Sequence, residues 1–160
     1  MNKDYFLELA QYNIWANQKM TDWLLQISEE QWSQKLIGSF ESIEATAIHT
    51  AGAEKVWFER LHNQAQPFLT LTFKGNKSDL IEIWKNASEN LKNYVSEIYD
   101  EDLEESFAYE SIKGEDFSRV KYQAIAHVFN HSTYHRGQLV NYLRQVGFIE
   151  IDTTDLIYFY

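Results

Sequence analysis

Residues 121–146, KYQAIAHVFNHSTYHRGQLVNYLRQV, are the stretch of sequence that decides the fold. No proline interrupts them, and they are followed directly by Gly147, a residue type that often ends helices in the left-handed conformation. The stretch therefore predicts a long helix that stops at this glycine. It also carries His127, His131 and His135 at intervals of four residues, so the same helix holds the side chains most relevant to function.

Three further segments upstream have the pattern of long helices, because their apolar residues recur mostly at three- and four-residue intervals. These segments are residues 3–27, 42–63 and 78–98. Ser42 is a suitable N-cap for the second, and Ser78, next to Asp79, for the third. Four long helical segments predict an all-α protein, an antiparallel four-helix bundle formed by a single domain over residues 1–160.

Shorter elements are expected between the long helices. Residues 28–31, Ser-Glu-Glu-Gln, have the pattern of a capping box and predict a short helix through Trp32 and Leu36. Residues 64–77 contain Pro67, the only proline of the chain, and are expected to form the long connection.

The region after the third long helix has a different pattern. Phe107, Tyr109 and Phe117 flank a short polar segment that contains Gly114, which predicts a small β-hairpin turning at the glycine. Residues 155–160, DLIYFY, are too apolar to extend freely into solvent, so we expect this tail to pack back on the helices.

The composition argues against several classes of function. The formal net charge is −10, from 24 acidic and 14 basic residues, and such a field repels phosphate backbones, so no nucleic acid is expected as a partner. The chain has no cysteine, so no protein thiolate can act as a ligand or nucleophile. Residues 1–20 lack a signal-peptide pattern, and no apolar run approaches the roughly 20 residues that span a bilayer. We therefore expect a soluble, cytoplasmic protein with no membrane partner.

The three histidines of the last helix are spaced to bind a metal ion in pairs. A step of four residues rotates a side chain by about 40° and advances it by about 6 Å, so neighbouring histidines share a face. His127 and His135 are about 12 Å apart along the axis, too far for one coordination shell. One adjacent pair therefore binds, either His127 with His131 or His131 with His135.

A third protein ligand has to come from a facing helix. His49 lies between Ile48 and Ala51 on an apolar stripe, where a polar ring needs a partner. His62 lies at a helix end beside Asn63 and is interpreted as a solvent-exposed or capping histidine. The alternative interpretation of His49 is an ordinary hydrogen-bonded core residue, and histidine pairs four residues apart also occur on plain helix surfaces.

Residues 127–138, HVFNHSTYHRGQ, form a specific motif that closely resembles the last-helix signature of the DinB family, one of the DinB/YfiT-like metalloenzymes. The resemblance extends to other parts of the chain. Residues 12–17, YNIWAN, resemble the family's first-helix motif, residues 48–61 its second helix, and residues 154–156, TDL, its tail. It therefore covers nearly the whole sequence.

This resemblance implies an up-down four-helix bundle with an unusual connection between its helices. Proteins of the family are often dimeric. A homodimer also suits the surplus of aromatic residues, ten Tyr, ten Phe and five Trp. The family's metal site takes one histidine from the second helix and two, four residues apart, from the last. At the matching positions these are His49, His131 and His135. His127 would then lie one turn along, at the rim of the pocket or packed beneath it.

Three neutral imidazoles would leave one or more coordination positions open for water or substrate, which is typical of a catalytic site. Such ligation suits Zn²⁺ or Ni²⁺ and is compatible with Fe, Mn or Co. Each ligand should donate its second ring N–H to a carboxylate, a carbonyl or water. Asn13, Asn17 and Glu54 are candidates for such roles, with ordinary interhelical contacts as the alternative.

Other residues near the motifs are assigned outside the site. Tyr134 and Arg136 flank His135 but project about 100° away from it on the helix, so Arg136 is interpreted as an ion-pair or interface residue. Trp15 and Trp57 are candidates for the pocket mouth, but aromatic residues at helical spacing more often pack in the core, so both are left out of the site.

Members of the family with known chemistry include thiol-dependent transferases, in which a metal lowers the pKa of a low-molecular-weight thiol. The resemblance therefore implies a metal-dependent transferase that uses a thiol cosubstrate and acts on a small electrophile. One alternative is a metal-dependent hydrolase, although no HExxH motif supplies its base. The other is a non-catalytic, metal-binding helical bundle related to stress. The expected partners are a small-molecule substrate and a second copy of the chain.

Overall fold

Long helices account for most of the computed structural model, which describes residues 2–64 and 67–160. The elements in chain order are α1 (Lys3–Gln26), α2 (Glu29–Ser33), α3 (Ile43–Leu61), α4 (Leu69–Thr72), α5 (Lys77–Glu97), η1 (Glu101–Glu104), β1 (Ser106–Glu110), β2 (Asp116–Val120), α6 (Lys121–Gln145) and η2 (Leu156–Tyr158). The described part of the chain is thus mostly helical, with one small two-stranded sheet. None of its helices combines the length and the apolar character of a membrane span.

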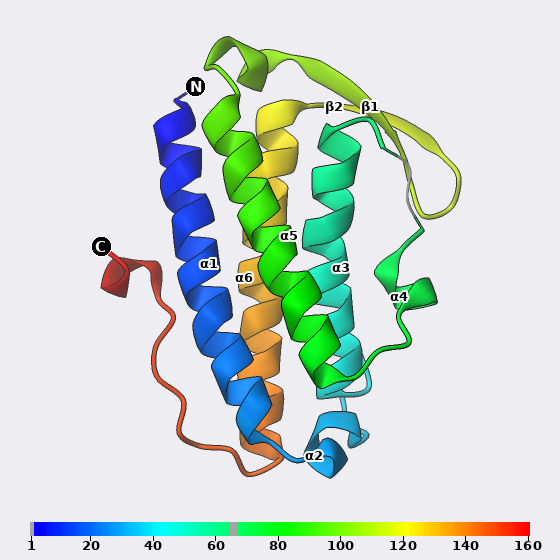
Figure 1. Ribbon diagram of the computed structural model, residues 1–160, viewed down its shortest axis with the longest axis vertical. Helices are drawn as coiled ribbons and strands as arrows, with labels where there is room; N and C mark the ends of the chain where they lie inside the picture. Colours follow the sequence, from blue (N-terminus) through cyan, green and yellow to red (C-terminus); the bar gives the residue numbers. More distant parts are fainter. Residues whose placement is uncertain (1, 65–66) are drawn as a thin grey trace.

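The long helices α1, α3, α5 and α6 lie side by side (Figure 1). α1 packs against α5 and α6, and α3 packs against the same two helices. In Figure 1, α1 and α6 run downward, whereas α3 and α5 run upward. The predicted antiparallel orientation therefore describes α1 with α5 and α3 with α6. It does not describe α1 with α6 or α3 with α5, which run in the same direction, because the long connection after α3 returns to the end at which α3 begins.

Side chains cap the helix starts as the sequence predicts, with one exception. Ser42 accepts a backbone hydrogen bond of 3.0 Å at the start of α3, and Ser28 forms the predicted capping box at the start of α2. The predicted start of α5 at Ser78 is wrong. Its N-cap is Asn76, because Asp79 then occupies the third helical position and accepts a hydrogen bond from the Asn76 backbone, which completes a capping box.

The short helices also differ from the prediction. α2 ends at Ser33, before the expected Leu36. The connection between α3 and α5 contains α4, which the sequence does not predict because no side chain caps its start. Buried Leu69 anchors α4 on α3, where a side chain at Gly52 would begin only 3.0 Å from the Leu69 Cβ. Residues 65–66 of the predicted connection lie outside the described residues.

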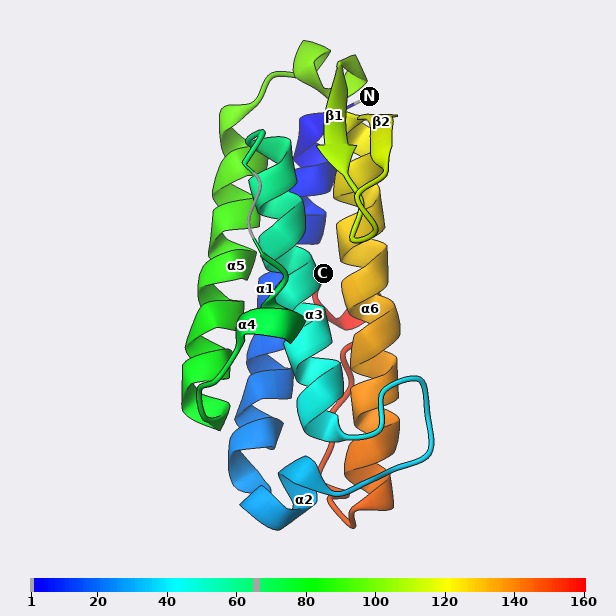
Figure 2. The same ribbon diagram turned by 90° about the vertical axis from the view of Figure 1, so that its right-hand side faces the viewer.

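The predicted hairpin is present between η1 and α6. β1 pairs antiparallel with β2, Tyr109 lies opposite Phe117, and Gly114 has a left-handed φ of 77° in the turn. β1 contacts α3, β2 contacts α6, and α4 contacts α3. Figure 2 shows the hairpin and α4 on the side of the molecule where α3 and α6 face the viewer. These segments therefore cover the pair of helices that carries the histidines.

The core consists of two apolar clusters separated by a polar layer. The first cluster includes Met20, Trp84 and Leu139. The second includes Phe6, Leu91 and Ile125. Along each long helix, buried polar side chains fall between the members of the two clusters. The polar residues of this layer are Asn13, Asn17, Glu54, Ser88, Ser132 and Arg136.

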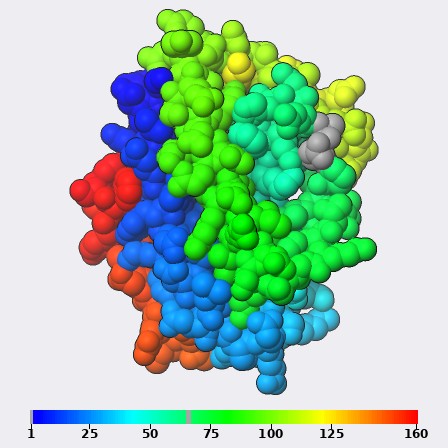
Figure 3. Space-filling view, viewed as in Figure 1, coloured from blue at the N-terminus to red at the C-terminus, as the bar shows by residue number. Residues whose placement is uncertain are grey.

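The C-terminal tail packs against α1, as predicted, but only in part (Figure 3). The ring of Phe159 lies 6.0 Å from that of Tyr12 and 5.8 Å from that of Trp15. The Tyr12 hydroxyl donates a hydrogen bond of 2.7 Å to the backbone oxygen of Thr154. The exposed residues of the tail include Ile157, Tyr158 and Tyr160.

Candidate metal centre

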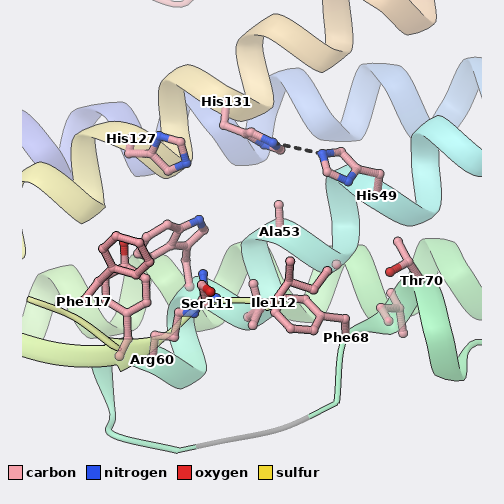
Figure 4. Close-up of a pocket in the computed structure, with 15 residues that line it drawn as sticks. His49, Ala53, Arg60, Phe68, Thr70, Ser111, Ile112, Phe117, His127 and His131 are labelled. Carbon is pink, nitrogen blue, oxygen red and sulfur yellow. Dashed lines mark hydrogen bonds between the residues drawn. The ribbon is translucent and has the colours of Figure 1, made fainter. Parts of the chain in front are cut away.

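Three of the five histidines converge between α3 and α6. His49 lies in the middle of α3, while His131 and His135 lie one turn apart on α6, which packs against α3. The Nε2 atom of His131 is 3.0 Å from Nε2 of His49 and 3.1 Å from Nε2 of His135. One ring nitrogen from each residue lies within 4.8 Å of the others. Figure 4 shows His49 and His131 facing each other. The spatial convergence predicted for these three residues is confirmed.

A hydrogen bond fixes the tautomer of His135. Its Nδ1 lies 2.8 Å from Oε1 of Gln138, and because an amide oxygen only accepts, the ring nitrogen carries the proton. The Nε2 atom of His135 therefore presents a lone pair toward His131. The Nδ1 atom of His131 is buried and has no hydrogen-bond partner among the described residues.

Burial keeps the three rings neutral. Desolvation lowers the pKa of His49 to about 4, and the nearby His135 adds to this effect. The pKa of His131 falls to about 3, chiefly through burial and then through repulsion by the neighbouring histidines. Burial also lowers the pKa of His135, although its hydrogen bond to Gln138 acts in the opposite direction. Since a neutral imidazole keeps the lone pair that a metal requires, all three residues can be ligands near neutral pH.

Two of the three nitrogen–nitrogen separations in the cluster suit a divalent transition-metal ion, and all three nitrogens lie within 4.8 Å of one another. At a metal–nitrogen distance of about 2.1 Å, two ligand nitrogens are separated by about 3.0 Å in octahedral and about 3.4 Å in tetrahedral coordination. The separations from Nε2 of His131, 3.0 and 3.1 Å, agree with the lower value. Without an ion, at most one of these two contacts can be a hydrogen bond, because Nε2 of His135 carries no proton and Nε2 of His131 can either donate one hydrogen or only accept. A bound cation would instead accept the Nε2 lone pairs of all three rings.

Aromatic side chains hold the rings in place. Phe40, which precedes α3, stacks on His49 with ring centroids 4.3 Å apart and an interplanar angle of 29°. The Tyr142 hydroxyl donates a hydrogen bond of 2.8 Å to the backbone oxygen of Phe40 and so fixes this loop. Tyr134 contacts the ring of His135 edge-on at 5.0 Å. These contacts restrict rotation of the imidazoles, so the cluster is largely preorganised.

A cavity of about 340 Å³ opens beside the histidines. This volume is within the range of small-molecule pockets, about 300–1,000 Å³. One face of α3, the hairpin, the region of α4 and the first half of α6 form its walls. The lining residues include His49, Trp57, Arg60, Tyr109, Phe117 and His131. Of the described residues that line the cavity, none is Asp or Glu.

The remaining histidines and the two tryptophans also have defined places. His127 lines the cavity, with its ring 5.6 Å from that of His131 and 5.1 Å from that of Trp57, which corresponds to the predicted rim position. His62 is the exposed C-cap residue of α3, as predicted. Trp57 packs against the second apolar cluster and also lines the cavity once the hairpin folds over α3, which corresponds to the pocket-mouth alternative. Trp15 packs against the tail.

Asn13, Asn17 and Glu54 do not orient the histidines. Glu54 is fully buried, and its Oε1 accepts hydrogen bonds from the side-chain amides of Asn13 (3.1 Å) and Asn17 (2.8 Å). Because Glu54 follows His49 by five residues, it projects about 140° away from that histidine on α3. The alternative interpretation, interhelical contacts, is therefore confirmed. Sequence reasoning missed Gln138 as the partner of His135, although the three-residue spacing between them on a helix could have revealed it.

Arg136 completes this buried network. It is 1% exposed, and its Nη1 donates hydrogen bonds to Oδ1 of Asn13 (2.5 Å) and Oδ1 of Asn17 (2.8 Å). The two asparagines thus accept from the guanidinium and donate to the carboxylate of Glu54. The interpretation of Arg136 as an ion-pair or interface residue is therefore wrong. Arg136 lies in the core, where the side-chain amides of the two asparagines connect it to Glu54. We refer to Asn13, Asn17, Glu54 and Arg136 as the buried network.

Fold and site together define a class of protein: a mostly helical chain in which two packed helices bring three histidines together beside a cavity of small-molecule size. A model of the DinB family matches residues 1–159, nearly the whole sequence. The chain belongs to the DinB family.

Individual relatives agree with this assignment. Protein DinB of Bacillus subtilis (strain 168) is 23% identical over 165 residues, which cover 98% of this chain and 95% of that protein. A crystal structure of a DinB-like protein from Bacillus cereus has a TM-score of 0.68 at 20% identity, over 92% of this chain and 95% of the other. A second, from Bacillus subtilis, has a TM-score of 0.66 at 15% identity, over 92% and 97%. At these identities the two structures support the fold alone.

Proposed function

We propose that the chain binds one divalent transition-metal ion through Nε2 of His49, His131 and His135 and uses it in a reaction on a small molecule. The observation that carries this proposal is the convergence of three neutral imidazoles, two of which, His49 and His131, line a cavity. Three protein ligands leave room for a further ligand, as in catalytic metal sites. Nitrogen ligands of this kind favour zinc or nickel.

The side chains around the cluster have distinct parts in this function. When bound, the metal would act as a Lewis acid that lowers the pKa of a coordinated thiol or water. Gln138 keeps His135 in the tautomer with a free Nε2, and Phe40 holds the ring of His49. The apolar walls of the cavity reduce access of water, which strengthens electrostatic interactions inside it.

The cavity favours thiol transfer over hydrolysis as the reaction. Hydrolysis needs a general base for the attacking water, and no carboxylate is found among the described residues that line the cavity. Glu54, a buried acid of α3, is engaged in hydrogen bonds on the other side of the helix. We therefore propose an S-transferase that joins a low-molecular-weight thiol to a small electrophile. The thiol would be a cosubstrate, since the chain has no cysteine.

Elemental analysis of protein purified without added metal tests the metal site. We expect close to one metal ion per chain in the parent and a large loss in His49→Ala. His62→Ala is the matched control, because His62 caps the same helix but is exposed and remote from the cluster. Equal metal content in the parent and in His49→Ala contradicts the proposal.

Turnover separates the enzyme from a non-catalytic bundle. Conjugation of a chromogenic electrophile to a low-molecular-weight thiol should require metal, stop after chelation and be lost in His131→Ala. Turnover of an ester in place of the thiol reaction would support the hydrolase. Full metal occupancy without turnover of either substrate would support a metal-binding, stress-related protein without catalysis.

We also propose the finer architecture, a DinB/YfiT-like four-helix bundle that forms a homodimer. The packing of α1, α3, α5 and α6 around a shared core and the long connection after α3 support the bundle. The exposed Tyr5 on α1 and the exposed apolar residues of the tail support a second copy as partner. Sedimentation analysis that gives only monomer at micromolar concentration contradicts the dimer.

A further inference from the structure

Arg60 lies in the same cavity as the histidines, but at the other end. It follows His49 by eleven residues, or three helical turns. Both side chains therefore leave the same face of α3, about 16 Å apart along the axis. Figure 4 shows Arg60 near Ser111 and Phe117, on the opposite side of the cavity from His49 and His131.

Aromatic rings surround the guanidinium of Arg60. Its Cζ lies 4.8 Å from the ring centroid of Trp57, 4.7 Å from that of Tyr109 and 5.5 Å from that of Phe68. These rings stabilise the cation but offer it no strong hydrogen-bond acceptor. The Nη2 atom donates a hydrogen bond of 2.9 Å to the backbone oxygen of Glu110, which fixes the orientation of the group. A guanidinium has five N–H donors, so further donors remain for a ligand.

No acidic side chain balances the charge of Arg60. In residues 2–64 and 67–160, the ion pairs found with carboxylates involve lysines, and the adjacent Glu59 pairs with Lys55. Burial lowers the pKa of Arg60, as expected for a half-buried cation that lacks a compensating carboxylate. The chain has a net charge of −10, so this uncompensated positive group at the cavity wall differs in sign from the protein as a whole.

A row of aromatic rings connects Arg60 to the histidine cluster. The ring of Trp57 is 5.1 Å from that of His127, which in turn is 5.6 Å from that of His131. The pKa of His127 is lowered by burial and then by the positive charge of Arg60, so the field of the guanidinium extends along this wall. An elongated molecule can therefore lie along the row with one end at each site.

We propose that Arg60 binds the carboxylate of the small molecule whose other end reaches the histidine cluster. This inference rests on the proposed function, because the metal bound by the histidines defines the reacting end. The substrate class is an elongated carboxylic acid with an apolar or aromatic middle that packs on Trp57 and Tyr109. A planar guanidinium matches a carboxylate in shape and offsets its single charge. A phosphate dianion would keep an unbalanced charge in an acidic protein.

Arg60 also joins α3 to the hairpin through Tyr109 and the backbone of Glu110, and this contact could be its whole role. The two roles differ in what they predict for ligands. A purely structural arginine affects the binding of an acid and of its amide equally. A carboxylate-binding arginine determines the preference for the acid.

Calorimetric titration with 3-phenylpropionate and with its neutral amide, 3-phenylpropionamide, measures this preference. The parent is compared with Arg60→Gln, which keeps a donor for the Glu110 backbone, and with Arg60→Lys, which keeps the charge but loses the planar fork. Arg119→Gln is the matched control. Arg119 lies on the hairpin that Arg60 contacts, is exposed, and has its Cζ 5.4 Å from the ring of Phe117. Circular dichroism verifies that each variant is folded.

We expect the parent to bind the acid about ten- to a hundredfold more tightly than the amide, as for a hydrogen bond to a charged group. Arg60→Gln should bind both probes equally, Arg60→Lys should show an intermediate preference, and Arg119→Gln should behave like the parent. Equal binding of the two probes by the parent overturns the inference. The inference is also overturned if Arg60→Gln still prefers the acid over the amide. It is overturned as well if Arg60→Gln and Arg119→Gln both lose this preference.

Metal content is measured in the same samples, before and after chelation, because a carboxylate can also bind a metal ion. A preference that survives chelation and depends on Arg60 supports the anion site. If the chain binds no metal but the preference follows Arg60, the proposed metal function fails and the anion site stands. If metal is bound but the preference is independent of Arg60, the metal function stands and the anion site fails.

Discussion

Two clusters of polar side chains share the helices α3 and α6, the buried network with two further residues from α1, and they differ in how their atoms are paired. In the buried network, donors face acceptors: the amides of Asn13 and Asn17 bridge the guanidinium of Arg136 and the carboxylate of Glu54. In the histidine cluster, atoms of the same kind face one another, three Nε2 atoms of neutral rings.

A shift of one residue along α6 separates the two arrangements. His131 lines the cavity and His135 contacts His131 one turn further along, whereas the next residues, Ser132 and Arg136, are buried in the layer between the apolar clusters. One residue corresponds to about 100° on a helix, so two faces of the same turn serve different purposes. Complementary partners therefore mark a cluster that stabilises the fold. Three nitrogen atoms of one kind that cannot all be hydrogen-bonded to one another, beside a cavity, mark a cluster that needs a ligand.

The largest effect on stability is expected when Glu54, the acid of the buried network, is replaced. Glu54→Ala leaves the charge of Arg136 buried without its counter-charge and removes the acceptor of several buried donors. We expect the free energy of unfolding to fall by about 3–5 kcal/mol, measured by urea denaturation. Glu54→Gln keeps the shape of the side chain and serves as a second variant if Glu54→Ala does not fold.

The control for Glu54 is Glu82→Ala, since Glu82 is an exposed acid on α5. Its free energy of unfolding should change by less than about 0.5 kcal/mol. If Glu54→Ala costs no more than this control, the buried network does not stabilise the fold and the contrast between the two clusters is lost.

The second effect concerns the histidine cluster, where we expect a substitution to weaken metal binding much more than it lowers the stability of the fold. His131→Ala removes the ring whose Nε2 contacts both other histidines, so we expect metal affinity to fall by more than about a hundredfold, the upper value typical for loss of a ligand's hydrogen-bond partner. Stability of the metal-free protein should change much less than in Glu54→Ala, because Nδ1 of His131 has no described hydrogen-bond partner and its Nε2 contacts only the two other histidines. Competition with a chromophoric chelator and denaturation after chelation measure the two quantities. If the variant loses stability but keeps its metal, His131 stabilises the fold, as the residues of the buried network do, and is not a metal ligand.

The third effect tests whether the cluster depends on hydrogen bonds around it. Gln138→Ala removes the acceptor of the His135 Nδ1 proton, so the tautomer with a free Nε2 is no longer favoured. We expect metal affinity to fall by about 10–100-fold, or about 1.4–2.7 kcal/mol. Gln123→Ala, an exposed glutamine on the same helix, is the control. Equal affinities in the two variants would show that Gln138 does not position His135.

Much of the histidine cluster could be predicted from the sequence, because its information is local. A four-residue spacing places His131 and His135 on one face of any helix, and an apolar stripe around His49 already requires a polar partner. The start of α3 was also predictable, since Ser42 is an N-cap residue followed by a helical pattern. The spacing left the choice of histidine pair open, and the family resemblance made it.

The buried network and the cavity could not be predicted, because they depend on contacts distant in sequence. Arg136 looks like a surface residue until Asn13 and Asn17, more than a hundred residues earlier, are brought against it. Trp57 looks like a core residue until the hairpin closes over α3. The short helix α4 was missed for the same reason, as its contact with Gly52 shows.

The smallest effect is expected at His127, which belongs to neither cluster. It lines the cavity next to His131, yet its ring packs on Trp57, and eight residues separate it from His135. Because that separation is about 12 Å along the helix, His127 and His135 cannot share one coordination shell. We expect His127→Ala to change the free energy of metal binding by less than about 0.5 kcal/mol, as for most exposed positions. Chelator competition on this variant and on His135→Ala decides which residue pairs with His131. A large loss of affinity in His127→Ala and none in His135→Ala would shift the site by one turn toward Arg60 and redraw the boundary between the metal cluster and the cavity wall.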